Sequence, residues 1–230
     1  MGFTIIFFIA FVALWIWWEK THYNDSPWVK NRIKGRDDEQ KAAIRYFCNK
    51  PNFLSKKPIS DEEYEDIIRN FLKSHDFKKK AINKLGLDED QVKEIEPVHF
   101  EGYVYNDEKA LAKVGKDGLW RSSKYQITWL FFSDTEVYIY QYSFFLDQDG
   151  RSERTEDYFY KDITSFTTIS DTEETPQYDE KMGKTFLVNV DSNRFAITVP
   201  GDRFYCSIEQ NDYTERSIQG MKAKLREKKS

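Results

Sequence analysis

Few of the side chains that carry chemistry stand at spacings typical of a functional site. The three histidines, His22, His75 and His99, are far apart in sequence, and none has a cysteine at a metal-ligand spacing. The chain contains no nucleophilic serine elbow, phosphate-binding glycine loop or cysteine–histidine signature. We therefore expect no catalytic residue, no metal site and no cofactor, and a protein that is not an enzyme.

Two acidic stretches could hold a cation. Residues 146–153, LDQDGRSE, supply Asp147 and Asp149, but an EF-hand loop needs three acidic or amide positions before its glycine. Arg151 also intrudes, so we interpret the segment as a hairpin turn. We expect the second stretch, residues 171–183, to be a solvated loop that at most gathers a weak divalent ion through Asp171, Glu173, Glu174, Asp179 and Glu180.

Residues 81–95, AINKLGLDEDQVKEI, have the pattern of a helix-turn-helix. The second helix would carry one basic residue, Lys93, against four acidic ones, Asp88, Glu89, Asp90 and Glu94. A phosphate backbone would repel that surface, and the formal net charge of the whole chain is -4. We therefore expect a plain helical packing segment and no nucleic-acid partner.

The first residues form an apolar run. From Phe3 to Trp18 there is no charge, and tryptophans follow one another at its end, as at a membrane–water interface. A cleaved signal peptide and a buried core helix are the alternatives, but no basic residue precedes the run and no small-residue cleavage site follows it. The sequence predicts a transmembrane anchor at residues 1–19, through Phe3, Ile5, Phe8, Phe11, Leu14, Trp15, Trp17 and Trp18.

Basic residues lie only after this run, at Lys20, Lys30, Arg32, Lys34 and Arg36. The side with the basic flank remains inside, so we expect a single-pass protein of the cell membrane with its N-terminus outside and its C-terminal domain cytoplasmic. Its partners would be the lipid bilayer, through the N-terminal helix, and a protein partner or a second copy. Residues 20–36 read as a basic juxtamembrane linker. Cys48 and Cys206 are expected to be buried, reduced thiols.

Residues 37–96 have a helical period and predict a small helical module. Ser60 and Glu63 form a capping box before an apolar face of Tyr64, Ile67, Ile68, Phe71 and Leu72. A further helix ends at Gly86, and a last short one would turn Val92 and Ile95 inward.

After Pro97 the period changes to two, which predicts strands. The clearest candidates are residues 98–105, 124–132 and 136–145. Later segments predict a hairpin of residues 185–190 and 194–199 that turns at Asp191–Asn193, then a short strand at 203–208. A closing helix carries Ile218, Met221 and Leu225 on one stripe, which could cover strand residues such as Trp129 and Phe186.

Residues 98–229 resemble a pleckstrin-homology-like domain in its bacterial form. The resemblance rests on the meander 124–144, on residues 160–163, YKDI, before a tight corner, and on the terminal helix SIQGMKAKLREKK. It implies an antiparallel pleckstrin-homology-like β-barrel or sandwich at residues 97–230, capped by a C-terminal α-helix. With the N-terminal transmembrane helix and the small helical module predicted above, the fold class is α+β. An all-β sandwich with an added helix is the alternative.

Barrels of this kind bind phosphoinositides or peptides in other lineages. The resemblance makes Lys116, Arg121 and Lys124 candidate ligand-facing basic groups, although the first hairpin turn, residues 133–136, is acidic. Two hypotheses for function remain. The first is a membrane-anchored, non-catalytic protein-interaction or assembly module, and the second is a lipid-headgroup-binding protein or an enzyme with a dispersed site. A set of buried, mutually satisfied polar groups would favour the first, and a deep pocket that holds a histidine or carboxylate with a strongly shifted pKa would favour the second.

Overall fold

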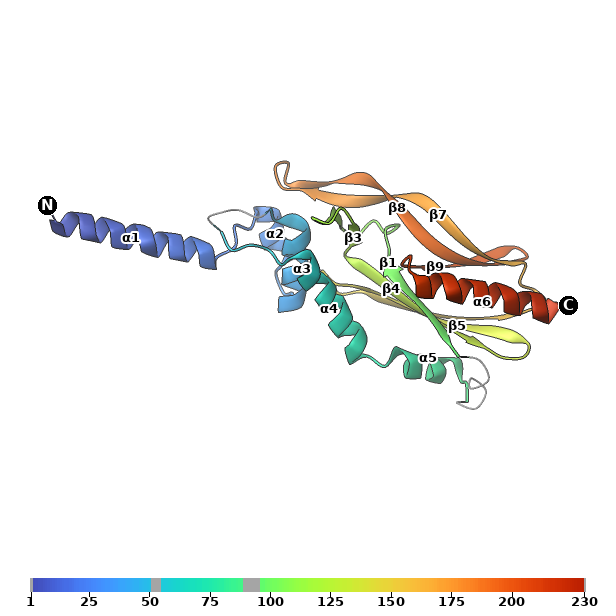
Figure 1. The fold of residues 1–230 in the computed structure, drawn as a ribbon. Coiled ribbons are helices and arrows are strands. Elements are labelled where there is room, and N and C mark those ends of the chain that lie inside the picture. The colour runs from blue at the N-terminus through green and yellow to red at the C-terminus, as the bar shows by residue number, and fades with distance from the viewer. Residues whose placement is uncertain (1, 51–54, 89–95, 230) are drawn as a thin grey trace.

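The computed structural model describes residues 2–50, 55–88 and 96–229, with side chains from Ile9 onward. The chain has an α+β fold of antiparallel sheets and a C-terminal helix, as expected. Three layers succeed one another in Figure 1: helices, a first sheet, and a second sheet with the last helix beside it.

The first sheet has the strand order β1-β4-β5-β6, from β1 (Val98–Tyr103), β4 (Lys124–Phe132), β5 (Glu136–Phe145) and β6 (Arg151–Phe159). Strand β4 is buried on both faces. Tyr125 and Phe131 contact the helical layer, whereas Leu130 and Phe132 contact the opposite core. Burial on two sides explains why the end of β4 reads as a continuous apolar run.

The second sheet has the order β7-β8-β9, from β7 (Ser165–Asp179), β8 (Lys184–Val199) and β9 (Asp202–Ser207). The predicted loop at 171–183 and the predicted hairpin turn at Asp191–Asn193 are both wrong. The turn comes earlier, at Gly183, whose φ of 64° suits glycine. Asp191 and Asn193 instead pair with β7, where Thr172 Oγ1 donates to Asp191 at 2.9 Å and Ser170 Oγ donates to Asn193 at 2.7 Å. A small two-stranded sheet joins β2 (Ala112–Val114) to β3 (Trp120–Ser122).

The helices of the first layer are α2 (Pro27–Arg32), α3 (Asp38–Cys48), α4 (Asp61–Ser74) and α5 (Phe77–Leu85). The capping box of Ser60 and Glu63 is present, and α5 ends at Gly86 in the left-handed conformation. Tyr64 and Ile68 of α4 share one core with strand residues such as Tyr142. Val92 and Ile95, expected on a further helix, lie outside the described residues.

Side chains fasten the segment before α3 to both sheets. Trp28 stacks on Tyr178 of β7 with ring centroids 4.5 Å apart, and Arg32 forms an ion pair of 2.7 Å with the buried Asp147. Arg36 pairs with Asp149 at 2.8 Å. Residues 20–36, predicted as a linker, thus include α2 and contact the β5–β6 turn. The domain boundaries drawn from the sequence remain a prediction.

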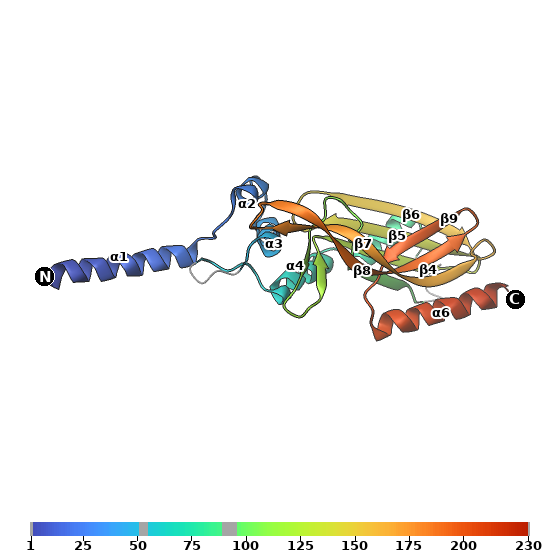
Figure 2. The ribbon, with the colours of Figure 1, turned by 90° about the horizontal axis from the view of Figure 1, so that it is seen from above.

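Helix α1 (Gly2–Thr21) projects away from the rest of the chain (Figures 1 and 2). Among the described residues, no helix is both long and apolar enough to cross a bilayer. The prediction of a transmembrane anchor, and with it the single-pass membrane assignment, is therefore wrong. Glu19 and Lys20 lie inside α1, in its last turn.

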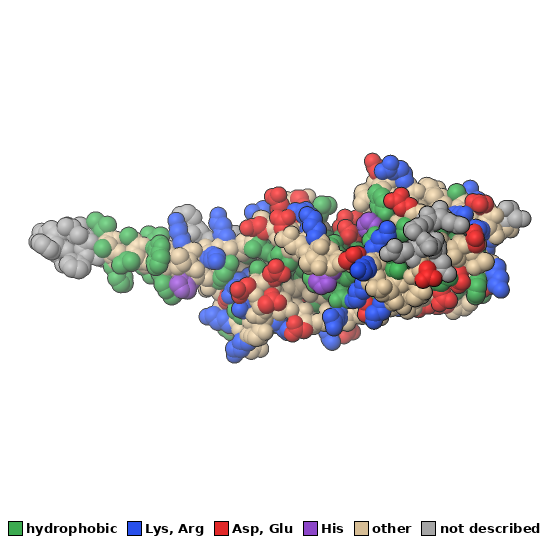
Figure 3. Space-filling model, turned by 90° about the horizontal axis from the view of Figure 1, so that it is seen from below, with side chains coloured by type: hydrophobic (Ala, Val, Ile, Leu, Met, Phe, Trp, Pro, Cys, Tyr) green, Lys and Arg blue, Asp and Glu red, His purple; other side chains and the backbone are tan. Residues whose placement is uncertain are grey.

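The contact with the bilayer that was expected through this helix is not supported either. Phe3, Ile5 and Phe8 lie outside the described side chains, and the remaining predicted anchor residues are exposed, namely Phe11, Leu14, Trp15, Trp17 and Trp18. On the face shown in Figure 3, hydrophobic side chains gather along α1, whereas acidic and basic ones are interspersed over the rest.

Helix α6 (Asp212–Lys229) packs through the predicted stripe. Ile218, Met221 and Leu225 are buried in the core between the two sheets, with Phe100 and Phe195 among their neighbours. Trp129 and Phe186 are not part of this core, contrary to expectation. Trp129 packs with the helical layer, and Phe186 is exposed on β8.

The burial of α6 gives a first test. Leu225→Ala should lower the free energy of unfolding by about 2 to 4 kcal/mol, because it leaves a cavity under the helix. The exposed neighbour offers a matched control, and Arg226→Ala should change stability little. Urea titrations of both full-length variants measure the difference. Equal stabilities of the two variants would mean that α6 does not pack against the hydrophobic core.

Candidate functional site

The two sheets meet at a glycine. A Cβ atom added to Gly102 of β1 would lie 3.1 Å from the backbone nitrogen of Ile208 and 3.2 Å from its carbonyl carbon. The backbone nitrogen of the next residue, Glu209, donates to the carbonyl oxygen of Glu101 at 2.9 Å. We call this contact of residues 101–102 with 207–209 the seam. It places Glu101 and Glu209 side by side although they are far apart in sequence.

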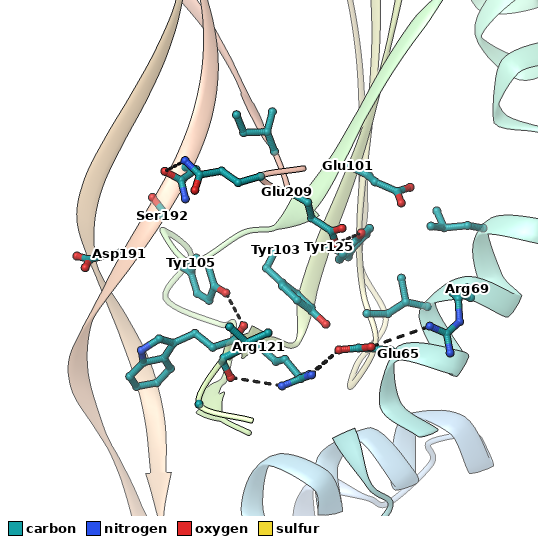
Figure 4. A pocket seen from close by; sticks show the side chains of 18 residues that line it. Glu65, Arg69, Glu101, Tyr103, Tyr105, Arg121, Tyr125, Asp191, Ser192 and Glu209 are labelled. Carbon is teal, nitrogen blue, oxygen red and sulfur yellow. Dashed lines mark hydrogen bonds and ion pairs between the residues drawn. The ribbon is translucent and has the colours of Figure 1, made fainter. Parts of the chain in front are cut away.

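A cleft of about 710 Å³ opens beside the seam (Figure 4). Helix α4 forms one wall through Glu65, Ile68, Arg69 and Leu72. Strands β1 and β4 form the floor, β3 the lower edge, and residues 191–193 of β8 the far side. The site therefore depends on all three layers of the fold.

Glu101 and Glu209 form a carboxyl pair in this cleft. Burial, and then the charge of Glu209, raises the pKa of Glu101 to about 7. The hydroxyl of Tyr125 donates to Glu209 Oε1 at 2.9 Å. Burial, followed by the two carboxylates, raises the pKa of Tyr125, so this hydroxyl remains a donor. Within the described part of the chain, no basic side chain forms a hydrogen bond or ion pair with either glutamate.

The arginines that line the cleft are engaged with other acids. Arg121, on β3, is buried and forms ion pairs with Glu65 and, at 2.7 Å, with Asp117. Arg69 pairs with Asp66 at 2.6 Å. Three carboxylates thus share these two guanidinium groups along the lower edge, and Figure 4 shows Glu65 between Arg69 and Arg121. Neither arginine pairs with Glu101 or Glu209, and the cleft carries an excess of negative charge.

Aromatic side chains face the same space. Tyr105 donates its hydroxyl to the carbonyl oxygen of Trp120 at 3.0 Å, which fixes both residues at the edge of the cleft. Tyr103 points its hydroxyl into the cleft (Figure 4), and no hydrogen bond to that hydroxyl is formed by another described residue. The site thus combines negative charge, aromatic rings and a hydroxyl available to a ligand.

The residues predicted from sequence are distributed differently. Arg121 lines the cleft in the ion pairs just described, Lys124 forms an ion pair of 2.6 Å with Asp107, and Lys116 is exposed on the β2–β3 turn. The structure does not bring the three together, and their role as ligand-facing groups remains a prediction.

The acidic stretches are also occupied by protein groups. Asp147 and Asp149 pair with arginines and form the predicted hairpin turn, while Arg194 pairs with Asp171 and, at 3.1 Å, with Glu173. In the part of the chain described, no three His, Cys, Asp or Glu side chains gather as metal ligands. His99 stacks on Trp129, and burial lowers its pKa.

Sequence reasoning missed Glu101 and Glu209. One signal was present: Glu101 and Gly102 interrupt the apolar strand 98–105, and a glycine inside a strand often marks close approach of another backbone. Nothing in the sequence indicates which backbone approaches.

The chain matches no known protein-family model, and neither a curated protein nor a solved structure matches it. The pleckstrin-homology-like resemblance therefore remains a prediction that rests on the order of strands and helix.

The close contact at the seam leads us to predict the effect of adding a methyl group at Gly102. Gly102→Ala should destabilise the chain by about 1 to 3 kcal/mol, because its Cβ would press on backbone atoms of Ser207 and Ile208. Gly220→Ala is the matched control: it lies on α6 with open space around it and should stabilise by up to about 1 kcal/mol. Denaturant melts of both variants decide whether the seam tolerates a side chain.

The raised pKa of Glu101 predicts a pH-dependent gain from Glu101→Gln. The folded chain holds the proton up to about pH 7, whereas the unfolded chain releases it near the ordinary value of 4.5. Wild-type stability is therefore lost as the pH rises from 4.5 through 7. The variant should be more stable than wild type by about 2 kcal/mol at pH 8 and indistinguishable near pH 4. Melts at both values test this, with the exposed Glu108→Gln as a control that should show no such change.

Proposed function

We propose that this chain is a non-catalytic binding protein whose cleft takes a positively charged organic group. The group could be a free amine or quaternary ammonium compound, or a basic side chain presented by a protein partner. One observation carries the proposal: the neighbouring carboxyl groups of Glu101 and Glu209 lack a basic partner among the described residues.

The electrostatic energy of the Glu101–Glu209 pair favours binding of a cation. Burial is the main cause of the raised pKa of Glu101, and the nearby charge of Glu209 adds to it, so the site disfavours ionisation of this carboxyl group. Holding such a pair lowers stability at neutral pH without benefit to the packing. A bound cation would offset that cost, because its charge lies next to both carboxylates.

The lining also suits an organic cation better than a bare ion. Aromatic faces attract ammonium groups by about 0.5 to 2 kcal/mol, and Tyr103, Tyr105 and Trp120 border the cleft. The volume of about 710 Å³ lies in the range of small-molecule sites. A calcium ion would seek six or more oxygen ligands, whereas the pair offers two carboxyl groups.

The cleft bears on the two hypotheses derived from sequence. A pocket with a shifted carboxyl pKa favours the second hypothesis, a ligand-binding protein or an enzyme with a dispersed site, over a surface that only packs against a partner. Its excess negative charge disfavours an anionic lipid headgroup. Its lining contains charges and rings but, among the described residues, no histidine, cysteine or lysine, and we therefore propose binding rather than catalysis.

Choline offers a direct test, because 3,3-dimethylbutan-1-ol has the same shape without the charge. The full chain should bind choline saturably at millimolar concentrations or below, and the neutral alcohol at least tenfold more weakly. Calorimetric titration with each compound measures this. A second arm compares acetylated peptides that carry one lysine or one norleucine, which distinguishes a free cation from a side chain of a partner.

Variants locate the binding. The double change Glu101→Gln and Glu209→Gln removes both charges and keeps the shape, so it should weaken choline binding by tenfold or more. Glu108→Gln, at an exposed turn, should leave the affinity unchanged. Equal binding of choline and the alcohol, or no binding of choline and lysine peptide, would overturn the proposal.

A further inference from the structure

The seam holds Glu101 and Glu209 at one fixed position. The hydrogen bond of 2.9 Å between their backbones and the close approach at Gly102 leave little freedom for the two residues to separate. Both residues line the cleft, and the carboxyl group of Glu209 accepts the hydrogen bond from Tyr125. The side chain of Glu101 is partly buried and that of Glu209 is exposed, and a proton on Glu101 or a bound cation would relieve the repulsion between their charges.

The basic side chains that line the cleft, Arg69 and Arg121, are both paired with other acids. From α4, Glu65 and Arg69 face the cleft, and Arg69 is committed to Asp66. From β3, Arg121 is committed to Glu65 and Asp117. These arginines cannot serve the pair without breaking short ion pairs.

The remaining neighbours are neutral or negative. Strand β4 presents the Tyr125 hydroxyl, which donates to Glu209, and β1 presents the Tyr103 hydroxyl. Tyr105 follows β1, and Asp191 of β8 accepts a hydrogen bond from Thr172. His99, two residues before Glu101, is held neutral at neutral pH, since burial lowers its pKa.

We propose that the cleft exchanges its cationic ligand for a proton on Glu101, so that occupancy of the site is coupled to pH. The inference rests on the proposed function, since it concerns the same cleft and ligand class. When the site is empty, Glu101 carries the proton and its repulsion with Glu209 is relieved. When the cation enters, its charge favours the ionised carboxyl group, and the proton leaves to the solvent.

The direction of the pH dependence follows from this exchange. Because burial and the charge of Glu209 raise the pKa of Glu101 to about 7, binding should weaken roughly tenfold for each pH unit below 7. Above pH 8 the carboxyl group is already ionised, and the affinity should become constant. Slightly acidic conditions would then release the ligand without any change in its concentration.

Choline is the suitable probe, because its quaternary charge does not titrate. Calorimetric titrations of the full chain at pH 6, in buffers of different ionisation enthalpy, count the protons released on binding. We expect about 0.9 proton per choline at pH 6 and about 0.1 at pH 8. Glu101→Gln should bind choline more weakly, through Glu209 alone, with no proton released and an affinity that varies less than twofold between these values.

Each outcome has a distinct meaning. Choline binding without proton release in the wild type would overturn the exchange and leave the proposed function standing. Proton release that persists in Glu101→Gln would assign it to another group and would also overturn the inference. If choline and the lysine peptide fail to bind at any pH, the proposed function itself fails.

Discussion

The main chains of the two sheets come into close contact at a residue that has no side chain. Gly102 leaves room for the backbone of Ile208, and the hydrogen bond between residues 101 and 209 closes the gap. On one side of this contact lies the core that α6 covers, and on the other lies the cleft. A close approach of main chains thus determines at once how the core is enclosed and which acids become neighbours.

The helical layer is part of the same folding unit as the first sheet. Tyr64 of α4 is fully buried, and its hydroxyl donates to the carbonyl oxygen of Ser122 at 2.7 Å. Lys80 of α5 reaches Glu153 of β6 at 2.8 Å. The buried hydroxyl of Tyr64 thus ties α4 to β3, and tertiary contacts of this kind position the wall of the cleft.

Elements formed by interactions between residues close in sequence were predicted correctly, whereas features formed by residues far apart in sequence were not. Strands β4 and β5 begin and end where the alternation of apolar residues predicted, and the Ser60 capping box formed as expected, because both signals are local. Strand β8 was split in error, since pairing with all of β7 outweighs the turn propensity of Asp191–Asn193. The carboxyl pair could not be predicted, because the residues around Glu101 in sequence do not indicate that residue 209 packs beside it.

The fastening of residues 22–36 has a mechanical consequence. Trp28 stacks on Tyr178 of β7 in the second sheet, while Arg32 and Arg36 form ion pairs with the β5–β6 turn of the first. Residues 22–36 would therefore not extend as a flexible linker under a force applied along α1. The force would enter the domain at two anchor points, one on each sheet, and would load the contact between the sheets in shear.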